Sequence, residues 1–466
     1  ERSFDVAVIG AGVVGCAIAR ELAHRDLSIA LIEAAQDIGV GTSKANTAIW
    51  HTGFDAVPGS LEAALLRRSF PLMDRYVEQA GIPAERTGAL LVAWTDHEVK
   101  ILDEIVERAQ ANGVRTRRLD PGELATVEPN LGAGALAALE IPDEGIVCPF
   151  TTPLAFATEA VANGVELLLD APVLAVERAH GHHVLITPRE RLRAAFVVNA
   201  AGLFADRVDR MFGYETFTIR PRKGELIVFD KAARALISHV ILPVPTATTK
   251  GVLVAPTVFG NVLLGPTAVE VDDPTDTSST AEGISFLLDR GRRLVPRLLD
   301  EEVTAVYAGV RSATEVRDYR IESHPERRYV TAGGIRSTGL SAAMGIAEYV
   351  RELLEDGGLR APARERVSSV RMPWIGERGL RPHRDPAAIA RDPDAGRVVC
   401  HCERVTRAEI LAAANAPIPA RSLDGLRRRT RAGFGRCQGF WCLGEVARLL
   451  AQASGTSAEA LLRVPS

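Results

Sequence analysis

The chain of 466 residues carries a formal net charge of −4, and 47% of its residues are hydrophobic while 24% are charged. The length predicts two or three domains of ordinary globular composition, and the charge gives no reason to expect a nucleic acid or an anionic membrane as partner. Because we find neither an apolar run long enough to span a bilayer nor a basic-then-apolar leader, we expect a cytoplasmic protein.

The first thirty-odd residues predict a dinucleotide-binding unit. An apolar strand at 4–9 runs into glycines spaced G-x-G-x-x-G, followed by a helix and a second strand that ends at Glu33. Gly10 would allow a tight turn, Gly12 the approach of backbone to a pyrophosphate, and Gly15 close packing of helix on strand. Glu33 is placed to accept hydrogen bonds from ribose hydroxyls. The alternative is a Gly-rich turn in an ordinary α/β unit.

A loop of small residues follows at 39–53. Its Thr42 and Ser43 supply hydroxyl and N–H donors of the kind that hold a pyrophosphate. Together with His51, which is followed by Thr and Gly, the stretch resembles the D-amino-acid-oxidase-type superfamily of FAD-dependent enzymes. It is most similar to the glycerol-3-phosphate dehydrogenase and 2-hydroxyglutarate oxidase branches of that superfamily.

Further along, periodicity predicts helices at 61–79, 96–112 and 152–163, a buried strand at 196–199, and alternating strands from 220 to about 303. The resemblance implies an α/β fold, with a Rossmann-like FAD-binding domain and an antiparallel-sheet substrate domain. Both would be discontinuous within residues 1–357. The expected FAD parts are about 1–60, 145–215 and 304–357, and the substrate parts are about 61–144 and 216–303.

The resemblance also implies FAD contacts in three later segments. The backbone near Val173 would pair with adenine, and Gly202 would lie in the small-residue turn that follows the strand at 196–199. Ser337, Gly339 and Leu340 would lie where a loop leads into a helix whose N-terminus faces the flavin pyrimidine.

His51 is the expected catalytic base. Hydride loss from an alcohol or amine carbon also requires loss of the heteroatom proton, and an imidazole titrates in the right range to accept it. Two alternatives stay open. His51 could simply hydrogen-bond beside the flavin, or, because it follows Trp50, it could be the site of covalent flavin attachment seen in related enzymes.

Arg311 and Arg336 precede loops that match the family near the flavin, and an arginine fork suits a carboxylate or a phosphate. Lys250 could help to hold the same anion. Each of these could instead be a solvated or structural residue. Ser312, Thr338, Met344 and Trp50 depart from the usual family residues in segments that we expect to line the substrate side, which leaves the substrate open.

Residues 358–396 lack periodicity and are expected to form a linker. Beyond it, Cys400, Cys402, Cys437 and Cys442 follow the spacing C-x-C, then C-x4-C. From the residues alone, this set could hold zinc or an iron–sulfur cluster. The segment resembles the BFD-like 2Fe-2S domain at the C-terminus of anaerobic-type glycerol-3-phosphate dehydrogenases, which implies a small helical domain at 397–460. Thr406 and Glu409 predict a capping box at the start of a helix.

The arginine run at 427–431 lacks the aromatic residues typical of nucleic-acid binding, so we expect it to offset a negative cluster or to dock a partner, or else to be solvated. Altogether the resemblance implies an FAD-dependent dehydrogenase with a 2Fe-2S cluster. It would oxidise glycerol 3-phosphate, or a similar small anionic substrate, and pass electrons to a partner flavoprotein or quinone-linked subunit, with possible membrane association through that partner. The alternatives are oxidation of a 2-hydroxy acid, an amino acid or an opine-like amine, and an electron-transfer subunit without substrate chemistry of its own.

Overall fold

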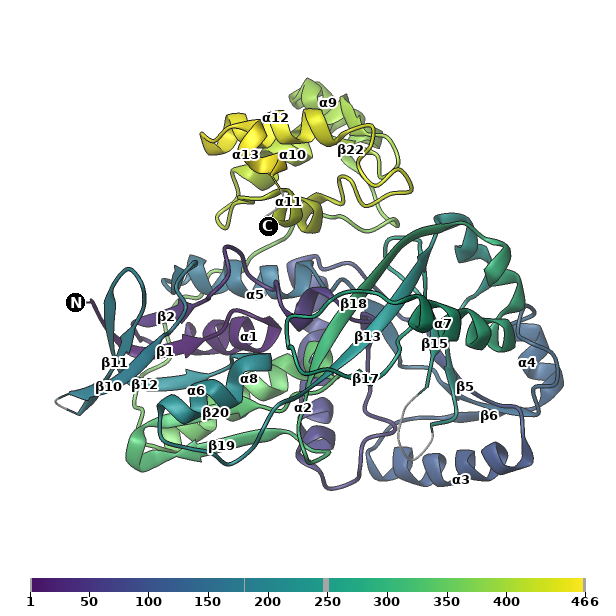
Figure 1. The fold of residues 1–466 in the computed structure, drawn as a ribbon, viewed down its shortest axis with the longest axis horizontal. Coiled ribbons are helices and arrows are strands. Elements are labelled where there is room, and N and C mark those ends of the chain that lie inside the picture. The colour runs from purple at the N-terminus through teal and green to yellow at the C-terminus, as the bar shows by residue number, and fades with distance from the viewer. Residues whose placement is uncertain (1, 180, 246–250, 464–466) are drawn as a thin grey trace.

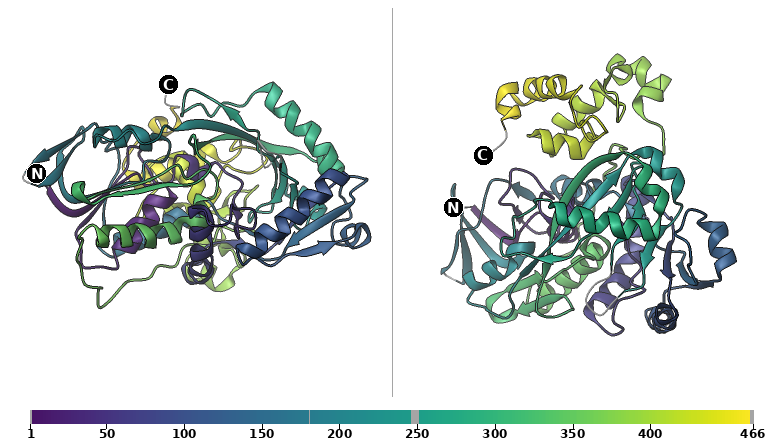
Figure 2. Two further views of the ribbon diagram at one scale, coloured as in Figure 1. Left: turned by 90° about the horizontal axis from the view of Figure 1, so that it is seen from below. Right: turned by 45° about the vertical axis from the view of Figure 1, so that its right-hand side comes forward.

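The structure is a computed structural model, and it describes residues 2–179, 181–245 and 251–463. Two sheet-containing domains lie side by side, and a smaller C-terminal domain rests on one edge of this pair (Figure 1). The right-hand view of Figure 2 also places the C-terminal domain on one side of the other two. The expected α/β class with a small helical C-terminal domain is confirmed.

The first sheet has a parallel core that surrounds the N-terminal strand. In this core β12 and β2 pair with opposite sides of β1, and β9 and β20 extend it. The parallel strands are β1 (Arg2–Ile9), β2 (Ile29–Ile32), β9 (Glu166–Leu168), β12 (Arg191–Asn199) and β20 (Tyr329–Gly333). Antiparallel strands at the edges are β10 (Ala175–Ala179), β11 (His182–Ile186) and β19 (Arg320–His324).

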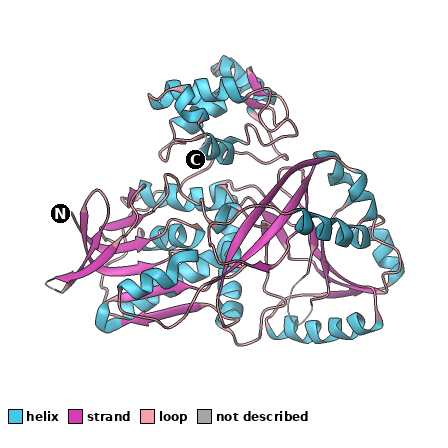
Figure 3. Cartoon of the chain, in the orientation of Figure 1, coloured by secondary structure: helices cyan, strands magenta, loops and turns pink. Residues whose placement is uncertain are grey.

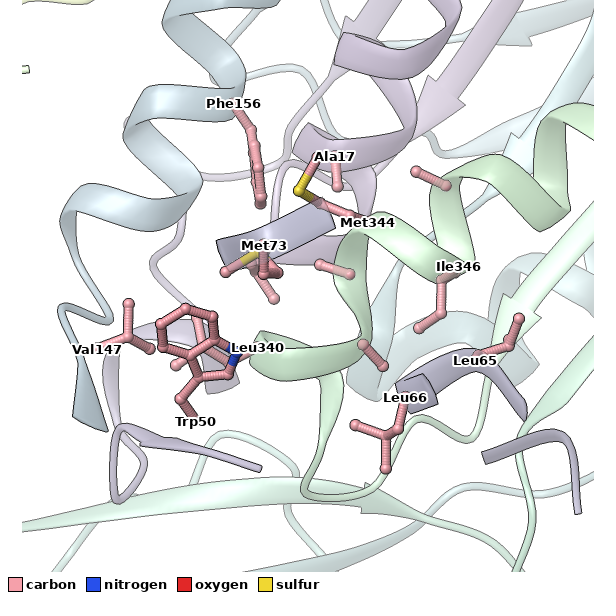
Figure 4. Close-up of a cluster of buried hydrophobic side chains, with 14 of the residues drawn as sticks. Ala17, Trp50, Leu65, Leu66, Met73, Val147, Phe156, Leu340, Met344 and Ile346 are labelled. Carbon is pink, nitrogen blue, oxygen red and sulfur yellow. The ribbon is translucent and has the colours of Figure 1, made fainter. Parts of the chain in front are cut away.

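Both faces of this sheet are covered by helices because side chains of β1 alternate between two apolar clusters. Val6 and Val8 belong to one cluster, and Ala7 and Ile9 to the other. The larger cluster is buried under α1 (Val13–Leu22), α2 (Leu61–Ala80), α5 (Thr151–Ala162) and α8 (Gly339–Asp356), and the smaller one under α6 (Ala205–Met211). Figure 4 shows side chains of these four helices meeting in the larger cluster: Ala17, Met73, Phe156 and Met344.

The second sheet holds the strands of the expected substrate domain and also β18 (Val303–Ala313), most of which falls in the segment 304–357 that was expected to belong to the FAD domain. Its other strands are β5 (Ala89–Ala93), β6 (Arg117–Leu119), β7 (Ala137–Ile141), β13 (Arg220–Phe229), β14 (Val240–Pro243), β15 (Leu253–Pro256), β16 (Val262–Gly265) and β17 (Val269–Glu270). Among the described pairings, β14 lies parallel to β5 and the others are antiparallel. The β5–β14 pair therefore joins the two sequence segments of this domain. Its helices are α3 (Asp96–Ala111), α4 (Pro121–Val127) and α7 (Ala281–Leu294).

A small sheet lies near the start of α8. It consists of β3 (Ile49–Trp50), β8 (Gly145–Val147) and β4 (Ala84–Glu85). Trp50 stands opposite Gly145 in the register of this sheet. The residues next to this pair, His51 and Glu144, are thereby brought together from segments far apart in the sequence.

Residues 358–396, expected to be a linker, contain the short helix α9 (Pro386–Arg391). Earlier in the segment, Arg364 N–H bonds to the carbonyl of His24 after α1 at 2.9 Å, and Met372 N–H bonds to that of Ala80 at the end of α2 at 2.7 Å. The segment is thus attached along the other domains. The segment also contains the 3-10 helices η6 (Pro382–Arg384) and η7 (Pro393–Gly396). Short 3-10 helices elsewhere are η1 (Thr42–Lys44), η2 (Gly202–Phe204), η3 (Lys231–Leu236), η4 (Pro296–Asp300) and η5 (Pro325–Arg327).

The C-terminal domain is mainly helical, as Figure 3 shows. Its elements are β21 (Val398–Cys400), β22 (Val405–Thr406), α10 (Arg407–Ala414), α11 (Leu423–Thr430), α12 (Leu443–Ser454) and α13 (Ala458–Leu462). The expected capping box of Thr406 and Glu409 is confirmed at the start of α10. Within the described residues, no helix has both the length and the apolar character needed to cross a membrane.

Candidate functional site

The glycine turn between β1 and α1 has the close contacts that its spacing predicts. A Cβ on Gly10, which has φ +102°, would lie 2.5 Å from the carbonyl oxygen of Ala200, and one on Gly15 would lie 1.8 Å from that of Gly10. The N-terminus of α1 begins after Gly12, which has no side chain to cap it. A helix N-terminus without a side-chain cap from its own N-cap residue is the arrangement that receives a phosphate in dinucleotide sites.

Ser43 and Thr42 lie in η1 beside this turn. The Ser43 hydroxyl accepts a hydrogen bond from Val13 N–H in the first turn of α1 at 2.9 Å, while the Thr42 hydroxyl donates to the carbonyl of Val310 on β18 at 2.6 Å. Ser43 also faces Gly12, because a Cβ there would lie 3.3 Å from its Oγ. The two residues thus connect the glycine turn with the substrate domain.

Glu33 lies at the end of β2, where the carboxylate accepts hydrogen bonds from Ala11 N–H at 2.7 Å and Ala35 N–H at 2.9 Å. Burial raises the pKa of Glu33, and these backbone donors only partly oppose that effect. The backbone of Ala171 bonds to the Glu33 carbonyl at 2.9 Å. This contact brings the Val173 segment beside the expected ribose-binding carboxylate, as an adenosine site needs.

The remaining expected FAD residues lie at two element starts. Gly202, with φ +55°, begins η2, close in sequence to the Ala200 carbonyl that contacts the glycine turn. Gly339 and Leu340 begin α8, and a Cβ on Gly339 would lie 3.7 Å from Val14 of α1. Ser337 is exposed just before α8. The structure therefore brings the starts of α1 and α8 close together, which fits a dinucleotide lying across them, while the individual FAD contacts stay predictions.

His51 lies where β3 meets the first turn of α8. Its backbone N–H donates to the hydroxyl of Ser341 at 2.8 Å, and its Nδ1 lies 3.1 Å from Oε2 of Glu144. The angles of this side-chain contact are poor for a hydrogen bond, which is common at catalytic sites before substrate binds. Glu144 is fully buried, and its other oxygen accepts from the backbone and hydroxyl of Thr52 at 2.6 and 2.7 Å.

A carboxylate fixed in this way accepts hydrogen bonds only, so it favours the imidazole tautomer with hydrogen on Nδ1 and the lone pair on Nε2. Sequence reasoning gave Glu144 no role. The missing signal was the pairing of β3 with β8, which the sequence does not reveal.

Trp50 was expected to line the substrate side, and its position differs. The indole is 2% exposed and packs in the large apolar cluster near Leu340 (Figure 4). The guanidinium of Arg86 lies 3.5 Å from the centre of the Trp50 ring. Trp50 is therefore a core residue that supports β3 next to His51.

Arg311 lies on β18 directly opposite Arg222 on β13. Like charges at opposed positions of a sheet are destabilising, and the described residues give Arg311 no ion-pair partner. Its guanidinium donates instead to the carbonyl of Thr267 at 2.9 Å. Burial, together with Arg222 and Arg336, lowers the pKa of Arg311 to about 10. The group is still cationic at neutral pH, so this is a site where an anion would relieve repulsion.

Arg336 belongs to the same group of cations. Its loop is tied to β18 by a hydrogen bond of 3.1 Å from the Ser312 hydroxyl to the carbonyl of Ile335. Burial lowers the pKa of Arg336 even though Glu62 opposes this shift. Arg222, which sequence reasoning did not single out, helps to lower the pKa of both expected arginines and so belongs to the same cationic group. Lys250, the other expected anion ligand, lies outside the described residues.

The four C-terminal cysteines are free thiols that lie in two neighbouring pairs. Cys400 interacts with Cys442, and Cys402 with Cys437. A hydrogen bond from Cys442, and others from backbone N–H groups, lower the pKa of Cys400 to about 6. Backbone N–H groups likewise lower the pKa of Cys437. The pKa of Cys402 and that of Cys442, the other member of each pair, are raised. One thiolate is therefore favoured in each pair, and thiolates are the ligands of iron–sulfur clusters.

Within the described part of the chain, no three or more His, Cys, Asp or Glu side chains are grouped so as to hold a single metal ion. Two adjacent thiol pairs are instead what a two-iron cluster requires, because each iron takes two cysteine ligands. The cysteines therefore fit a 2Fe-2S cluster.

The arginine run at 427–431 proves to be a contact between domains, which corrects the view of it as a solvated face. Arg428 and Arg429 each reach Asp37 in the nucleotide domain at 2.7 Å. Arg431 lies 4.0 Å from the ring centre of Phe259 in the substrate domain. These arginines dock the C-terminal domain onto its own chain.

Comparison with known proteins agrees with this geometry. Residues 5–353 match the model of the FAD dependent oxidoreductase family, and residues 398–452 match that of the BFD-like [2Fe-2S] binding domain. Glycerol 3-phosphate dehydrogenase of Caloramator mitchellensis is 36% identical, over 97% of this chain and 95% of its own. One of the subunits of the anaerobic glycerol-3-phosphate dehydrogenase of Escherichia coli K12 is 27% identical, over 98% of this chain and 89% of its own.

Among solved structures, the dithionite-reduced L-α-glycerophosphate oxidase from Mycoplasma pneumoniae with FAD bound superposes with a TM-score of 0.76 at 27% identity. The match covers 80% of this chain and 100% of that one. The chain therefore belongs to the FAD-dependent oxidoreductase family and is a flavoenzyme whose cofactors are FAD and, in its C-terminal BFD-like domain, a 2Fe-2S cluster.

Proposed function

We propose that this enzyme oxidises glycerol 3-phosphate to dihydroxyacetone phosphate and passes the electrons through its cluster to a partner protein. The observation that carries the substrate class is the opposition of Arg222 and Arg311, with Arg336 close by. A dianionic phosphate offers these guanidinium groups several acceptor oxygens at once. The names of the relatives in Caloramator mitchellensis and Escherichia coli support phosphate over carboxylate.

When bound, FAD would supply the hydride acceptor for C2 of the substrate. Nε2 of His51 takes the proton of the C2 hydroxyl, so that the C2–H and O–H bonds are lost together and a ketone forms. Glu144 holds the imidazole and stabilises the imidazolium that results. The arginines bind the phosphate and thereby orient C2, because they fix the far end of a short, flexible substrate.

Anaerobic titration of the flavin absorbance tests the substrate. We expect bleaching by glycerol 3-phosphate but not by glycerol, which lacks the phosphate. Bleaching by 2-hydroxyglutarate instead would mean that the arginines bind a substrate carboxylate and not a phosphate. Bleaching by amino acids or opine-like amines would identify an amine oxidation. If none of these compounds bleached protein that contained both cofactors, an electron-transfer subunit without substrate chemistry would be the better account.

We also infer where an electron acceptor docks. Phe440 and Trp441 lie between Cys437 and Cys442 and are 92% and 73% exposed. Exposed aromatic residues of this kind mark protein interaction sites. Their position on the cysteine loop supports docking of a redox protein directly over the cluster. The Escherichia coli relative is named as one subunit of a larger enzyme, which supports a partner subunit in turn.

Replacement of both aromatics, Phe440→Ser with Trp441→Ser, tests this docking. Glycerol 3-phosphate should still bleach the flavin, and ferricyanide, a small ion that needs no docking surface, should still reoxidise the enzyme at the original rate. Reduction of acceptors in membranes from the source cells should fall about ten-fold or more, as for loss of a binding hot spot. Equal rates with membranes for both proteins would place the acceptor elsewhere.

A further inference from the structure

The loop between β2 and η1 is held on both sides. It leads from Glu33, expected at the ribose, to Thr42 and Ser43, expected at the pyrophosphate. On one side, Gly39 N–H donates to the carbonyl of Ala11 in the glycine turn at 2.8 Å. On the other side, the loop meets α11 of the C-terminal domain. A cluster-domain helix therefore supports a loop whose two ends are both expected to contact FAD.

The contact between this loop and α11 is a buried ion-pair network. Both oxygens of Asp37 accept from Arg429, at 2.7 and 2.8 Å, and one also accepts from Arg428 at 2.7 Å. Arg428 further donates to the carbonyl of Ile38 at 2.8 Å. The three charged side chains are 4–7% exposed. Because removal of one partner would leave the other charges buried without compensation, such a network is costly to break.

The helix backbone takes part as well, because a Cβ on Gly425 would lie 2.7 Å from Oδ2 of Asp37. Burial would raise the pKa of Asp37, but the hydrogen bond from Arg429 and the charges of both arginines outweigh it and hold the pKa below its ordinary value. At the far end of the loop, Lys44 of η1 reaches Asp424 of α11 at 3.2 Å. The same helix thus contacts the middle and the end of the loop.

The other side of α11 is tied to the cysteine site. Leu426 is fully buried in the core of the C-terminal domain together with Cys400 and Cys442. Shortly after the helix ends at Thr430, the N–H of Gly433 points at the sulfur of Cys400, 3.5 Å away. Binding of the cluster fixes these cysteines, and it should fix the end of α11 with them because metal binding couples to folding.

We propose that α11 links the two cofactor sites thermodynamically, so that cluster binding and FAD binding strengthen each other through Asp37, Arg428 and Arg429. The coupling is reciprocal: whatever factor the cluster contributes to FAD affinity, FAD contributes to cluster affinity. It rests on the cofactors alone and not on the identity of the substrate.

The test measures FAD binding to the full chain, by recovery of flavin fluorescence on release, before and after the iron is removed by chelation. Without the cluster, the dissociation constant of FAD should rise about ten-fold in the natural sequence, a typical allosteric coupling. In Asp37→Asn the two forms should bind FAD equally. The proposal is overturned if chelation leaves FAD affinity of the natural sequence unchanged, or if Asp37→Asn retains the ten-fold difference.

A matched control comes from another contact between the same domains. Lys231 of the substrate domain pairs with Glu403 of the C-terminal domain at 3.3 Å and with Glu377 at 2.7 Å, and neither of these pairs involves the nucleotide loop. Lys231→Gln should retain the full ten-fold coupling. Loss of coupling in this variant would mean that domain docking in general, and not α11 on Asp37, carries the effect.

A second measurement needs no variant and so does not depend on whether Asp37→Asn folds. In the natural sequence, removal of FAD should weaken iron retention by the same factor that removal of iron weakens FAD binding. Iron transfer to a calibrated chelator, at equilibrium and with or without FAD, gives that factor. No effect of FAD on iron retention would refute the linkage. Since no substrate is present, neither measurement depends on the proposed dehydrogenase activity.

Discussion

The carboxylate of Glu144 lies 3.1 Å from Nδ1 of His51 and is held in place by Thr52. If this carboxylate sets the tautomer of a catalytic base, Glu144→Gln should slow flavin bleaching about 100-fold, within the range of a lost acid–base contribution. Stopped-flow absorbance measures the rate. The neighbouring Asp143→Asn is the control, because Asp143 makes a surface pair with Arg115. A rate unchanged by Glu144→Gln would leave Glu144 a structural residue.

Arg311→Lys tests the anion site. A lysine keeps the charge but loses the planar fork, so we expect the KM for glycerol 3-phosphate to rise about 10- to 100-fold, as for hydrogen bonds to charged groups. Reduction rates at saturating substrate should change less. Arg292→Lys, which alters an exposed pair with Asp289, should leave both parameters unchanged. An unaltered KM in Arg311→Lys would place the substrate anion elsewhere.

Alanine substitutions at two glycines near the nucleotide site test whether FAD binding needs the close packing at Gly15, or whether any added methyl group in this region weakens it. Gly15→Ala would bring a Cβ to 1.8 Å from the carbonyl oxygen of Gly10, whereas Gly41→Ala meets nothing within 4 Å. We expect Gly15→Ala to lose FAD during gel filtration, as measured by the flavin-to-protein absorbance ratio, because α1 must move away from the turn. Gly41→Ala should keep its FAD. Normal FAD content in Gly15→Ala would contradict the close packing.

Cys437→Ser should abolish the charge-transfer absorbance and the electron paramagnetic resonance signal of a reduced 2Fe-2S cluster. Glycerol 3-phosphate should still bleach the flavin, because hydride transfer does not involve the cysteines. Cys148→Ala is the comparison: this thiol is buried, bonds to the hydroxyl of Thr151 and is not one of the four C-terminal cysteines. A cluster spectrum that survives in Cys437→Ser would remove this residue from the ligand set.

The Asp37 network gives a pH dependence of stability with a defined sign. The arginines hold the folded pKa of Asp37 below its ordinary value of about 3.9, so the network contributes fully above that value and is lost as the pH falls through the lower, folded pKa. The melting temperature of the natural sequence should therefore exceed that of Asp37→Asn by a constant amount from pH 8 to pH 5. The difference should shrink below about pH 4. A difference that grows on acidification would contradict the assignment.

The nucleotide turn and the start of α10 could be predicted because a few neighbouring residues determine them: glycine spacing dictates where backbone must approach backbone, and Thr406 caps a helix with Glu409 three residues later. Glu144 and Arg222 could not be assigned in this way. Their significance depends on strand partners, His51 across the small sheet and Arg311 across β13 and β18, and register is a long-range property. The arginine run shows the same limit, because its charges find Asp37 nearly four hundred residues earlier.

The segment after α8 has a consequence for engineering. Its backbone bonds to the residues that follow α1 and end α2, and then at Glu377 to the carbonyl of Val258 in the substrate domain, 2.9 Å away. A chimaera in which everything after residue 357 came from another protein would uncover these surfaces as well as replace the C-terminal domain. A junction near residue 397 would keep residues 358–396 in place and exchange the C-terminal domain alone. Residues 358–396 and Asp37 both fix the C-terminal domain in place. If electrons leave through this domain as proposed, the acceptor must therefore come to it.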